Sequence, residues 1–417
     1  MLDKRIKSFR FELKLNSRQK ELCKQYGGIC RYVWNKFLEK KREAYKIEGK
    51  MLTEFDLNNF LTDWKRKLVW LRIAPSQALQ QVSKNLYQAF KNFFNGFGYP
   101  RFKKKGGRDS FRIPKGIKLL PQLSKKIGVV QIPKLKKVRF VKTREIEGKI
   151  KYVTISREGD KWFISFTCEV EMEITPQENN FFVVGIDRGI TISLQLSDGG
   201  RVKLSKPLKK YLSKLNWLME KFSRKEKGSS NWWKLKRKIQ KLCRHMANKR
   251  KDDMHKITTW LANNHGIIVL EALETKNMMR SAKGTVENPG KNVKAKSGLN
   301  RSIADEAWYL FQQLLEYKMD WRGGKVVYVD PKHTSQKCSR CKHISKNNRK
   351  SQASFTCERC GFKINADLNA GKNILSRYLE AAGHAVIACG RRVKILSLNQ
   401  ELEYRKPFST GNAAMSV

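Results

Sequence analysis

The chain has 417 residues, 40% of them hydrophobic, which is typical of folded protein and long enough for two or three domains. Lysine and arginine total 88 against 37 aspartates and glutamates, and the resulting formal charge of +51 predicts a polyanionic partner, nucleic acid, rather than an ordinary mixed-charge surface. No apolar stretch approaches the ~18 residues that a membrane span needs, and MLDKRIKSFRFEL lacks a signal-peptide core, so we expect a cytoplasmic protein without membrane contact.

The first part of the chain predicts one strand and then helices. Apolar residues alternate with polar ones at Phe9, Phe11, Leu13 and Leu15. This period of two predicts a strand. Asn16 with Gln19 matches a capping box and predicts a helix start. Further helices are predicted from Thr53 and from near Pro75, since proline suits a first helical turn.

A stretch rich in glycine, proline and basic residues, GFGYPRFKKKGGRDSFRIPKG, begins at Gly96 and indicates a loop or linker. Strands are expected from there to about residue 173. The clearest has apolar residues at alternate positions: Trp162, Ile164, Phe166, Cys168, Val170 and Met172. The first 175 residues therefore predict a β-domain with a helical insertion after its first strand, and TPQENN at 175–180 is the expected boundary.

Beyond this boundary, two apolar strands each carry an acid: FFVVGIDRGI holds Asp187 and GIIVLEAL holds Glu271. Between them, residues 203–251 hold 18 lysines and arginines against two acids and predict a pair of helices. Their basic face is either merely solvated or follows phosphates, and the imbalance favours the second interpretation. The remaining predicted elements are a mobile loop over 280–302, a helix over 303–321, the strand KVVYVD, a helix over 369–382 and a patternless tail.

Four of the nine cysteines form two pairs, Cys338-x2-Cys341 and Cys357-x2-Cys360, with 15 residues between them. This spacing is the usual signature of a structural zinc site, and four thiolates leave no open position for catalysis. The five other cysteines are scattered and do not predict a disulfide framework. Because four thiolates suffice, we do not expect His333 or His343 to bind the metal. Basic residues around the cysteines suggest that this finger also contacts nucleic acid.

Asp187, Glu271 and Asp367 are candidates for a divalent-metal site. Carboxylate oxygens are the ligands that Mg²⁺ prefers, and an ionised acid in an apolar strand is costly unless it is paired or bound to metal. Each has a plain alternative. Asp187 can pair with Arg188 or simply end a strand, Glu274 is as good a candidate as Glu271, and Asp367 can cap a helix. The spacing alone does not bring the three acids together.

Several segments together resemble the transposon-encoded TnpB proteins, relatives of the compact type V CRISPR nucleases. They are GGICRYVWNKFLEKKREAY, APSQALQQVSKNLYQAFKNFF, YPRFKKKGGRDSFRIP, VGIDRGI, NKRKDDMHKITTWL, IIVLEAL, EYKMDWRGGKVVYVDPKHTSQKCSRC and CGFKINADLNAGKNI. The match covers nearly the whole chain. It implies a prokaryotic protein that binds a structured guide RNA from the transposon end, whose pairing with double-stranded DNA selects the target. Monomer and dimer both stay open, and we expect a monomer bound to one RNA.

The resemblance implies an α+β, multidomain fold: a wedge-type β-barrel with a helical recognition insertion, then an RNase H-like (RuvC) domain with an inserted four-cysteine zinc finger. The expected boundaries are 1–15 and 97–178 for the wedge barrel, 16–96 for the recognition domain, 179–334 and 362–390 for the RuvC-like domain, 335–361 for the finger and 391–417 for a C-terminal tail. Asp187, Glu271 and Asp367 take the three acidic positions, which hold two Mg²⁺ ions. The 280–302 loop corresponds to a lid over the site. Some members have aspartate where this chain has Asn365, and others share its NAD sequence, so we do not interpret Asn365 as inactivating.

Two further predictions rest on this resemblance. Arg349 falls near an arginine that assists cleavage in relatives, where it would steady charge on the phosphate; a finger arginine on a backbone phosphate is the equal alternative. Ser76, Gln77 and Gln80 open the third helix, where the family contacts the motif beside the target. Amide side chains pair with adenine edges, whereas the plain alternative is a solvated helix turn.

The sequence therefore predicts an Mg²⁺-dependent, RNA-guided DNA endonuclease. Three alternatives stay open: a compact type V CRISPR effector, an RNA-guided DNA-binding protein that does not cut, and a transposase that joins strands without RNA. The presence of all three acids argues against the second. RNA dependence separates the third, and a neighbouring repeat array in the genome would separate the first.

Overall fold

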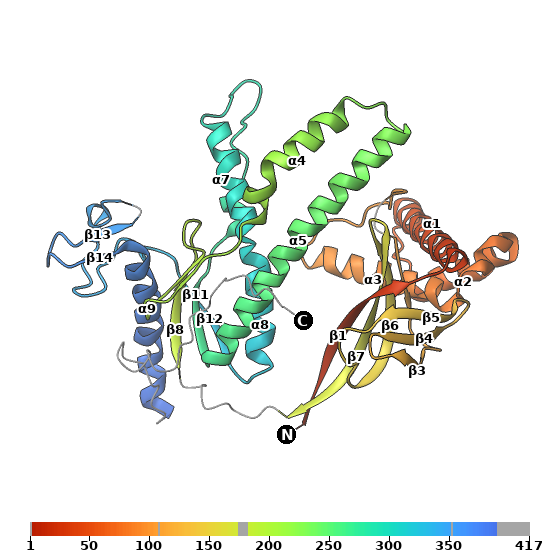
Figure 1. Cartoon of the computed structure of the whole chain (residues 1–417), viewed down its shortest axis with the longest axis horizontal. Coiled ribbons are helices and arrows are strands. Elements are labelled where there is room, and N and C mark those ends of the chain that lie inside the picture. Colours follow the sequence, from red (N-terminus) through yellow and green to blue (C-terminus); the bar gives the residue numbers. More distant parts are fainter. Residues whose placement is uncertain (1, 107–108, 174–181, 352, 390–417) are drawn as a thin grey trace. The chain divides into compact units, whose positions relative to one another are not determined.

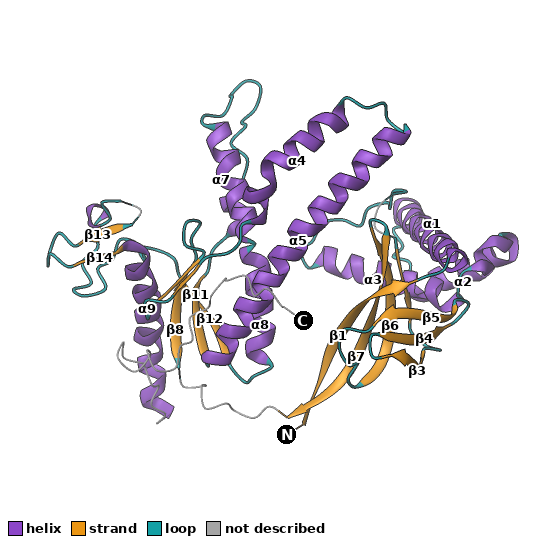
Figure 2. Ribbon diagram, viewed as in Figure 1, coloured by secondary structure: helices purple, strands orange, loops and turns teal. Residues whose placement is uncertain are grey.

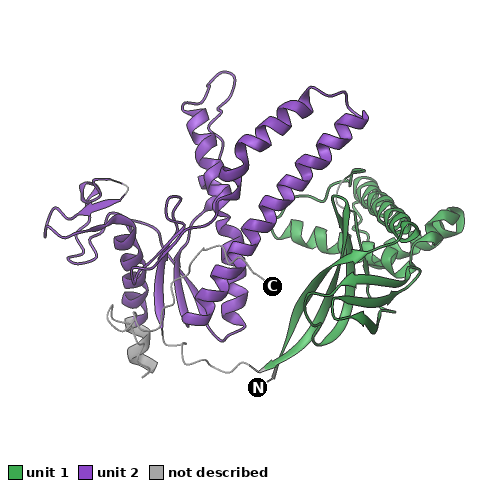
Figure 3. Ribbon diagram, viewed as in Figure 1, with its two compact units in different colours: residues 1–173 green, residues 174–417 purple. Residues whose placement is uncertain are grey.

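The computed structural model describes residues 2–106, 109–173, 182–351 and 353–389. The chain forms two compact units, residues 1–173 and 174–417 (Figure 3). Both units combine helices with a β-sheet (Figure 2), so the predicted α+β class is confirmed. The predicted tail over 391–417 and the predicted boundary at 175–180 lie outside the described residues.

The first unit is built on a seven-stranded sheet in which every neighbouring pair is antiparallel, in the order β2-β6-β7-β1-β5-β4-β3. The strands are β1 Leu2–Lys14, β2 Ser110–Ile113, β3 Lys118–Ser124, β4 Ile127–Ile132, β5 Lys136–Val141, β6 Lys149–Glu158 and β7 Lys161–Glu173. The long β1 pairs with β7 over most of its length and with β5 at its end, where Leu13 lies opposite Phe140. Its alternating Phe9, Phe11 and Leu13 are buried, as the period of two predicts.

Three helices follow β1: α1 Ser17–Glu48, α2 Glu54–Lys67 and α3 Ser76–Phe94, with the short 3-10 helix η1 Val69–Ile73 between the last two. The capping box of Asn16 and Gln19 is confirmed. A second box joins Thr53 to Asp56 at the start of α2. Pro75 lies just before α3 rather than inside its first turn. The helices and the sheet share one hydrophobic core.

The second unit contains a five-stranded sheet in the order β10-β9-β8-β11-β12. Its strands are β8 Val183–Asp187, β9 Leu194–Leu196, β10 Arg201–Val202, β11 Ile267–Glu271 and β12 Lys325–Val329. The central β8, β11 and β12 are parallel, whereas β9 and β10 form an antiparallel hairpin beside β8. The two strands that carry the predicted acids are therefore direct neighbours.

Helices cover both faces of this sheet (Figure 1). On one face, α5 Ser230–Asn264 and α8 Trp308–Asp320 pack on Ile186, Ile268 and Leu270. On the other, α9 Ala366–Cys389 contacts β8, β9, β11 and β12, and Ile374 of α9 packs with Val183 and Val269. Successive side chains of a strand point to opposite faces, so this pattern fixes which residues face α9.

The predicted basic helix pair is confirmed as α4 Pro207–Ser223 and α5, which share a small core of their own. The prediction for the next segment is wrong in part. Residues 293–302 are not loop but belong to α7 Val293–Glu306, after the short α6 Thr275–Met278. The predicted helix over 303–321 is broken at Ala307, whose φ of 50° ends α7 before α8 begins at Trp308.

The four-cysteine segment contains η3 Lys346–Asn348 and a two-stranded sheet of β13 Ser354–Thr356 and β14 Lys363–Asn365. β14 leads directly into α9, which begins at Ala366, three residues before its predicted start. The segment packs on a small cluster of its own that includes Phe355 and two of the cysteines. Among the described residues, no helix is long and apolar enough to cross a membrane.

Candidate active site and zinc centre

Asp187 and Glu271 lie at the ends of neighbouring parallel strands. Asp187 ends β8 and Glu271 ends β11, and the register pairs Ile186 with Leu270, one residue earlier on each strand. Each acid is an even number of residues after a valine that packs against α9, Val183 or Val269. Both carboxylates therefore belong to the face of the sheet that α9 covers.

Asp367 lies in the first turn of α9, so it comes from the helix that covers this face. The side chain of Asn365 accepts hydrogen bonds from the main-chain N–H groups of Asp367 and Leu368, both at 3.1 Å. Asn365 is thus the residue that caps the helix. The alternative of Asp367 as a helix cap is excluded, and the negative charge of its carboxylate acts on Asp187 at the end of β8.

The three acids share one electrostatic environment. Burial, followed by the negative charges of Glu271 and Asp367, raises the pKa of Asp187 to about 7. Burial also raises the pKa of Glu271, whose side chain is 8% exposed. Glu274, the rival candidate, is exposed and accepts a hydrogen bond from Asn277. The fold therefore brings Asp187, Glu271 and Asp367 together and leaves Glu274 outside.

Three arginines lie around these carboxylates. The charge of Arg377, from α9, acts to lower the pKa of Glu271. Arg349, from the four-cysteine segment, lies with its Nη2 atom 3.4 Å from Oδ1 of Asp367, and its charge acts to lower the pKa of Asp187. Arg188 is buried and donates a hydrogen bond from Nη2 to the main-chain oxygen of Glu271. Arg188 therefore links the end of β8 to the end of β11. The sequence-based alternative was only an ion pair between Arg188 and Asp187.

Sequence reasoning missed Thr334. Its hydroxyl group donates a 2.5 Å hydrogen bond to Oε1 of Glu271, and the residue is 4% exposed. Nothing in its local sequence, PKHTSQKC, marks it as a partner of an acid 63 residues earlier. Its position four residues before Cys338 is the one signal that places it near a site at all.

The donor set around the strand ends suits a hard divalent cation. Three carboxylates supply oxygen ligands of the type that Mg²⁺ and Mn²⁺ take, and mutual repulsion between them is relieved when a cation lies among them. Asp187, Glu271 and Asp367 are the residues that would hold it. Their ligand atoms do not form a group as tight as the cysteines, which are the one set of metal-binding side chains within 4.8 Å of one another in the described chain.

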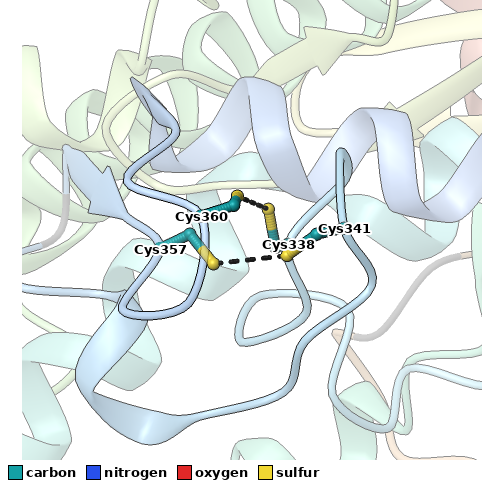
Figure 4. Close-up of side chains that lie close together, drawn as sticks. All are labelled: Cys338, Cys341, Cys357 and Cys360. Atoms are coloured by element: carbon teal, nitrogen blue, oxygen red, sulfur yellow. Dashed lines mark hydrogen bonds between the residues drawn. The ribbon is translucent and has the colours of Figure 1, made fainter.

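Cys338, Cys341, Cys357 and Cys360 converge from the two ends of the finger (Figure 4). The Sγ atoms of Cys338 and Cys360 are 3.8 Å apart, and those of Cys341 and Cys357 are 3.5 Å apart. Four sulfurs around a tetrahedral zinc ion at ~2.3 Å would lie ~3.8 Å from one another. A hydrogen bond from the main chain at His343 lowers the pKa of Cys341 to about 7, whereas burial raises the pKa of Cys338, so the support for zinc comes from the arrangement of the four sulfurs. The cluster therefore fits structural zinc.

The three predicted motif readers belong to the first unit, in the first turns of α3. Ser76 and Gln80 are exposed, whereas Gln77 is half-buried and its Oε1 atom has no hydrogen-bond partner in the described part of the chain. Ser76 and Gln80 are therefore accessible to a ligand, whereas the Oε1 atom of Gln77 is buried; the arrangement does not identify a ligand.

Comparison with solved structures assigns the fold. The chain superposes on the protein of the "Cas12f1-sgRNA-target DNA complex" with a TM-score of 0.56 and 14% identity, covering 89% of this chain and 98% of the other. Three family models match parts of it. Residues 165–282, with Asp187 and Glu271, match "Probable transposase", and residues 308–374, with the cysteines and Asp367, match "Cas12f1-like, TNB domain". Residues 1–50 match "Helix-turn-helix domain", although residues 2–50 form one strand and one helix. The chain thus has the mixed α+β fold of a compact Cas12f-like protein.

Two relatives found by sequence have a higher identity to this chain than the solved structure has. The chain is 43% identical over 394 residues to the "putative RNA-guided DNA endonuclease InsQ" of Escherichia coli K12, with 94% of this chain and 96% of the relative covered. It is 30% identical over 380 residues to a "putative RNA-guided DNA endonuclease" of Streptomyces pristinaespiralis, with 90% and 88% covered. The chain belongs to the TnpB family of these proteins. The resemblance that the sequence suggested is confirmed.

Proposed function

We propose that this protein is an RNA-guided DNA endonuclease that hydrolyses phosphodiester bonds. The single observation that carries this proposal is the convergence of Asp187, Glu271 and Asp367, from two strands and one helix, within a chain 43% identical to a protein named as such an endonuclease. The net charge of +51 supports nucleic acid as the partner. Its proposed partners are a guide RNA, which stays bound to the protein, and a double-stranded DNA target.

The nuclease unit is RuvC-like, of the RNase H type. Its support is the sheet order β10-β9-β8-β11-β12, with an antiparallel hairpin beside three parallel strands and an acid at the end of each of two neighbouring strands. Two divalent cations, Mg²⁺ in the cell, would activate the attacking water and stabilise the leaving oxygen. Asp187, Glu271 and Asp367 would hold them, and the products would carry a 3′-hydroxyl and a 5′-phosphate.

The chain's own residues prepare this chemistry. Asp187 must lose its proton to bind a cation, and its pKa of about 7 makes that step sensitive near neutral pH. Arg188 joins the two strand ends through the main chain of Glu271. Arg349, beside Asp367, would contact the scissile phosphate or hold the carboxylate in place. The alternative in which it only contacts a distant backbone phosphate has less support from this position.

The domain assignment is also a proposal. The sheet of the first unit would form the wedge barrel over 1–15 and 97–178, with the recognition helices over 16–96. Residues 179–334 and 362–390 would form the RuvC-like domain and 335–361 the zinc finger. Ser76, Gln77 and Gln80 would read the motif beside the target. The protein would work as a monomer with one RNA in a prokaryotic cytoplasm, on the nucleoid when bound to DNA.

A plasmid-cleavage assay tests the function. The protein is purified with its copurifying RNA, the RNA is sequenced, and a plasmid carrying the matching target is incubated with and without Mg²⁺. We expect cleavage only with RNA, target and Mg²⁺ together. Asp187→Ala and Glu271→Ala should abolish cleavage yet keep guided DNA binding, and unchanged cutting by either variant would refute the site. Strand joining without RNA would identify a transposase, and binding without any cutting would identify a guided binding protein.

A further inference from the structure

One side chain links the four-cysteine segment to the carboxylate of Glu271. Thr334 lies in the connection between β12 and Cys338, and its hydroxyl group is 2.5 Å from Oε1 of Glu271. The same hydroxyl lies 2.9 Å from the main-chain oxygen of Pro331. A hydroxyl has one proton, and an ionised carboxylate is the stronger acceptor. The shorter contact, to Glu271, is therefore the bond that matters.

The main chain at Thr334 is held from α9. Nδ2 of Asn373 donates hydrogen bonds to the main-chain oxygens of Thr334, at 2.8 Å, and of Lys337, at 2.6 Å. One turn earlier on α9, Asn369 donates to the oxygen of Lys337 at 2.8 Å and accepts from the N–H of Ser339 at 3.0 Å. Both asparagines are at least 96% buried, so water does not compete for these bonds.

The geometry therefore fixes the Thr334 hydroxyl relative to two carboxylates at once. It bonds directly to Glu271 on β11, and the helix that holds its main chain carries Asp367 in its first turn. A carboxylate bonded at one oxygen cannot rotate freely, and its second oxygen is left for another ligand. Groups that orient metal ligands in this way are worth ~10- to 100-fold in metal affinity or activity.

We propose that Thr334 is a positioning residue for Glu271: it orients that carboxylate for a divalent cation, and Asn373 holds Thr334 in place. The inference rests on the proposed nuclease function, because it gives Glu271 a metal to bind. It adds a residue outside the three acids and the arginines. It also gives the connection between β12 and Cys338 a part in the reaction.

Three variants of the full-length protein with its RNA test the proposal. Thr334→Val keeps the shape of the side chain and removes the hydroxyl, whereas Thr334→Ser keeps the hydroxyl. Thr258→Val is the matched control, because Thr258 is also buried in this unit. Its hydroxyl bonds to Met254 of α5 and Lys318 of α8, the two helices that cover the face of the sheet opposite α9. The measurements are the Mg²⁺ concentration that gives half-maximal cleavage, guided DNA binding, thermal stability and zinc content.

For Thr334→Val we expect the half-saturating Mg²⁺ concentration to rise about tenfold, with DNA binding and one zinc per chain retained. Thr334→Ser should restore the wild-type value, and Thr258→Val should keep it even if its melting temperature falls. Asn373→Ala should raise the Mg²⁺ requirement as well, and the double variant should be less affected than the two single effects combined, since both act through one contact.

A wild-type Mg²⁺ requirement in Thr334→Val would overturn the inference, as would an equal rise in Thr258→Val, which would show a general loss of stability. Loss of zinc from Thr334→Val would overturn it too, because the effect would then pass through the finger. Glu271→Ala tests the proposed active site separately from the positioning role of Thr334. If it still cuts DNA, the proposed active site fails, and the positioning role fails with it; if it is inactive while Thr334→Val needs no extra Mg²⁺, only the positioning role fails.

Discussion

Gly185 of β8 lies directly against the main chain of Gly371 in α9. A Cβ atom at Gly185 would come within 2.5 Å of the Gly371 carbonyl oxygen and within 2.7 Å of the N atom of Leu375. The helix that carries Asp367 therefore approaches the strand that carries Asp187 as closely as the backbones allow. No side chain other than hydrogen fits between them.

Gly185→Ala should consequently push α9 away from the sheet. Because backbone atoms cannot yield as a flexible side chain does, we expect a loss of ~1–3 kcal/mol in the free energy of unfolding and a strong loss of cleavage, since Asp367 moves with the helix. Chemical unfolding and plasmid cleavage measure the two effects. Gly298→Ala in α7 is the control, as a Cβ there meets nothing within 4 Å. Equal stability of the Gly185 and Gly298 variants would contradict the tight contact.

The raised pKa of Asp187 predicts a pH-dependent stability without divalent cations. The carboxyl titrates at about 7 in the folded chain against an ordinary value of 3.8, so the folded state holds the proton more tightly between these values. Stability therefore falls as pH rises from about 4 to about 7. Asp187→Asn should lack this fall and melt a few degrees higher than wild type at pH 8. Mg²⁺ should raise the wild-type melting temperature at pH 8 and leave the variant nearly unchanged. Identical melting curves for both proteins would refute the shift.

The ionisation of Asp187 should also appear in the cleavage rate, which should rise with pH where the stability falls. The proton competes with the cation for Asp187, so at limiting Mg²⁺ the rate should increase with pH up to about 7. Saturating Mg²⁺ should move the midpoint to lower pH, because the cation stabilises the ionised form. Single-turnover cleavage at two Mg²⁺ concentrations measures this. A midpoint that stays fixed when the Mg²⁺ concentration changes would mean that Asp187 does not bind the metal.

Arg349 is distinguished from other basic residues of the finger by its 3.4 Å contact with Asp367. Arg349→Ala should lower the cleavage rate by ~10- to 100-fold with little change in target affinity. Lys350→Ala, one residue further along, is the matched control for a residue that only adds positive charge. If both variants weaken DNA binding equally and cut at the same rate once bound, Arg349 is an ordinary backbone contact.

Cys357→Ser should release zinc and unfold the finger, since structural zinc binding is itself folding energy. Purified wild type should contain one zinc per chain by elemental analysis, and the variant none, with a lower melting temperature. Cys243→Ser serves as control, because Cys243 is free and exposed on α5. A wild-type protein without zinc, even when purified in its presence, would contradict the assignment.

Gln80 offers a test of motif reading. It is exposed in the first turns of α3, and a side-chain amide that reads a base contributes ~1–3 kcal/mol of discrimination. Gln80→Ala should therefore broaden the set of flanking sequences that permit cleavage of a randomised library. Gln88→Ala, on the same helix and also exposed, should leave the set unchanged. An unaltered preference in the Gln80 variant would favour a solvated helix turn.

Much of this fold is set by local patterns that the sequence reveals. The alternation from Phe9 to Leu13 and the capping box at Asn16 act within a few residues, and the structure confirms both. The apolar strands around Asp187 and Glu271 were equally clear. That the two acids face the same helix was not, because it depends on strand order and register, which neighbouring residues do not encode.

The failures have physical causes as well. Residues 293–302 are polar and carry Gly298, so their helical periodicity is weak although they form part of α7. The break at Ala307 needs a positive φ from a residue that rarely adopts it. Thr334 was missed because its partner, Glu271, is remote in sequence. The sequence does not distinguish such a threonine from one that bonds only to neighbouring residues.

In the sequence Asn365-Ala366-Asp367, capping of α9 and the proposed metal binding belong to different residues: Asn365 caps the helix, and Asp367 is the proposed ligand. Asparagine and aspartate are about equally good at starting a helix. Exchange of one for the other at position 365 should therefore keep the two main-chain bonds that begin α9 and keep Asp367 where it is. NAD and DAD should therefore be equivalent sequences at this point, because residue 365 caps the helix and the proposed metal ligand is residue 367.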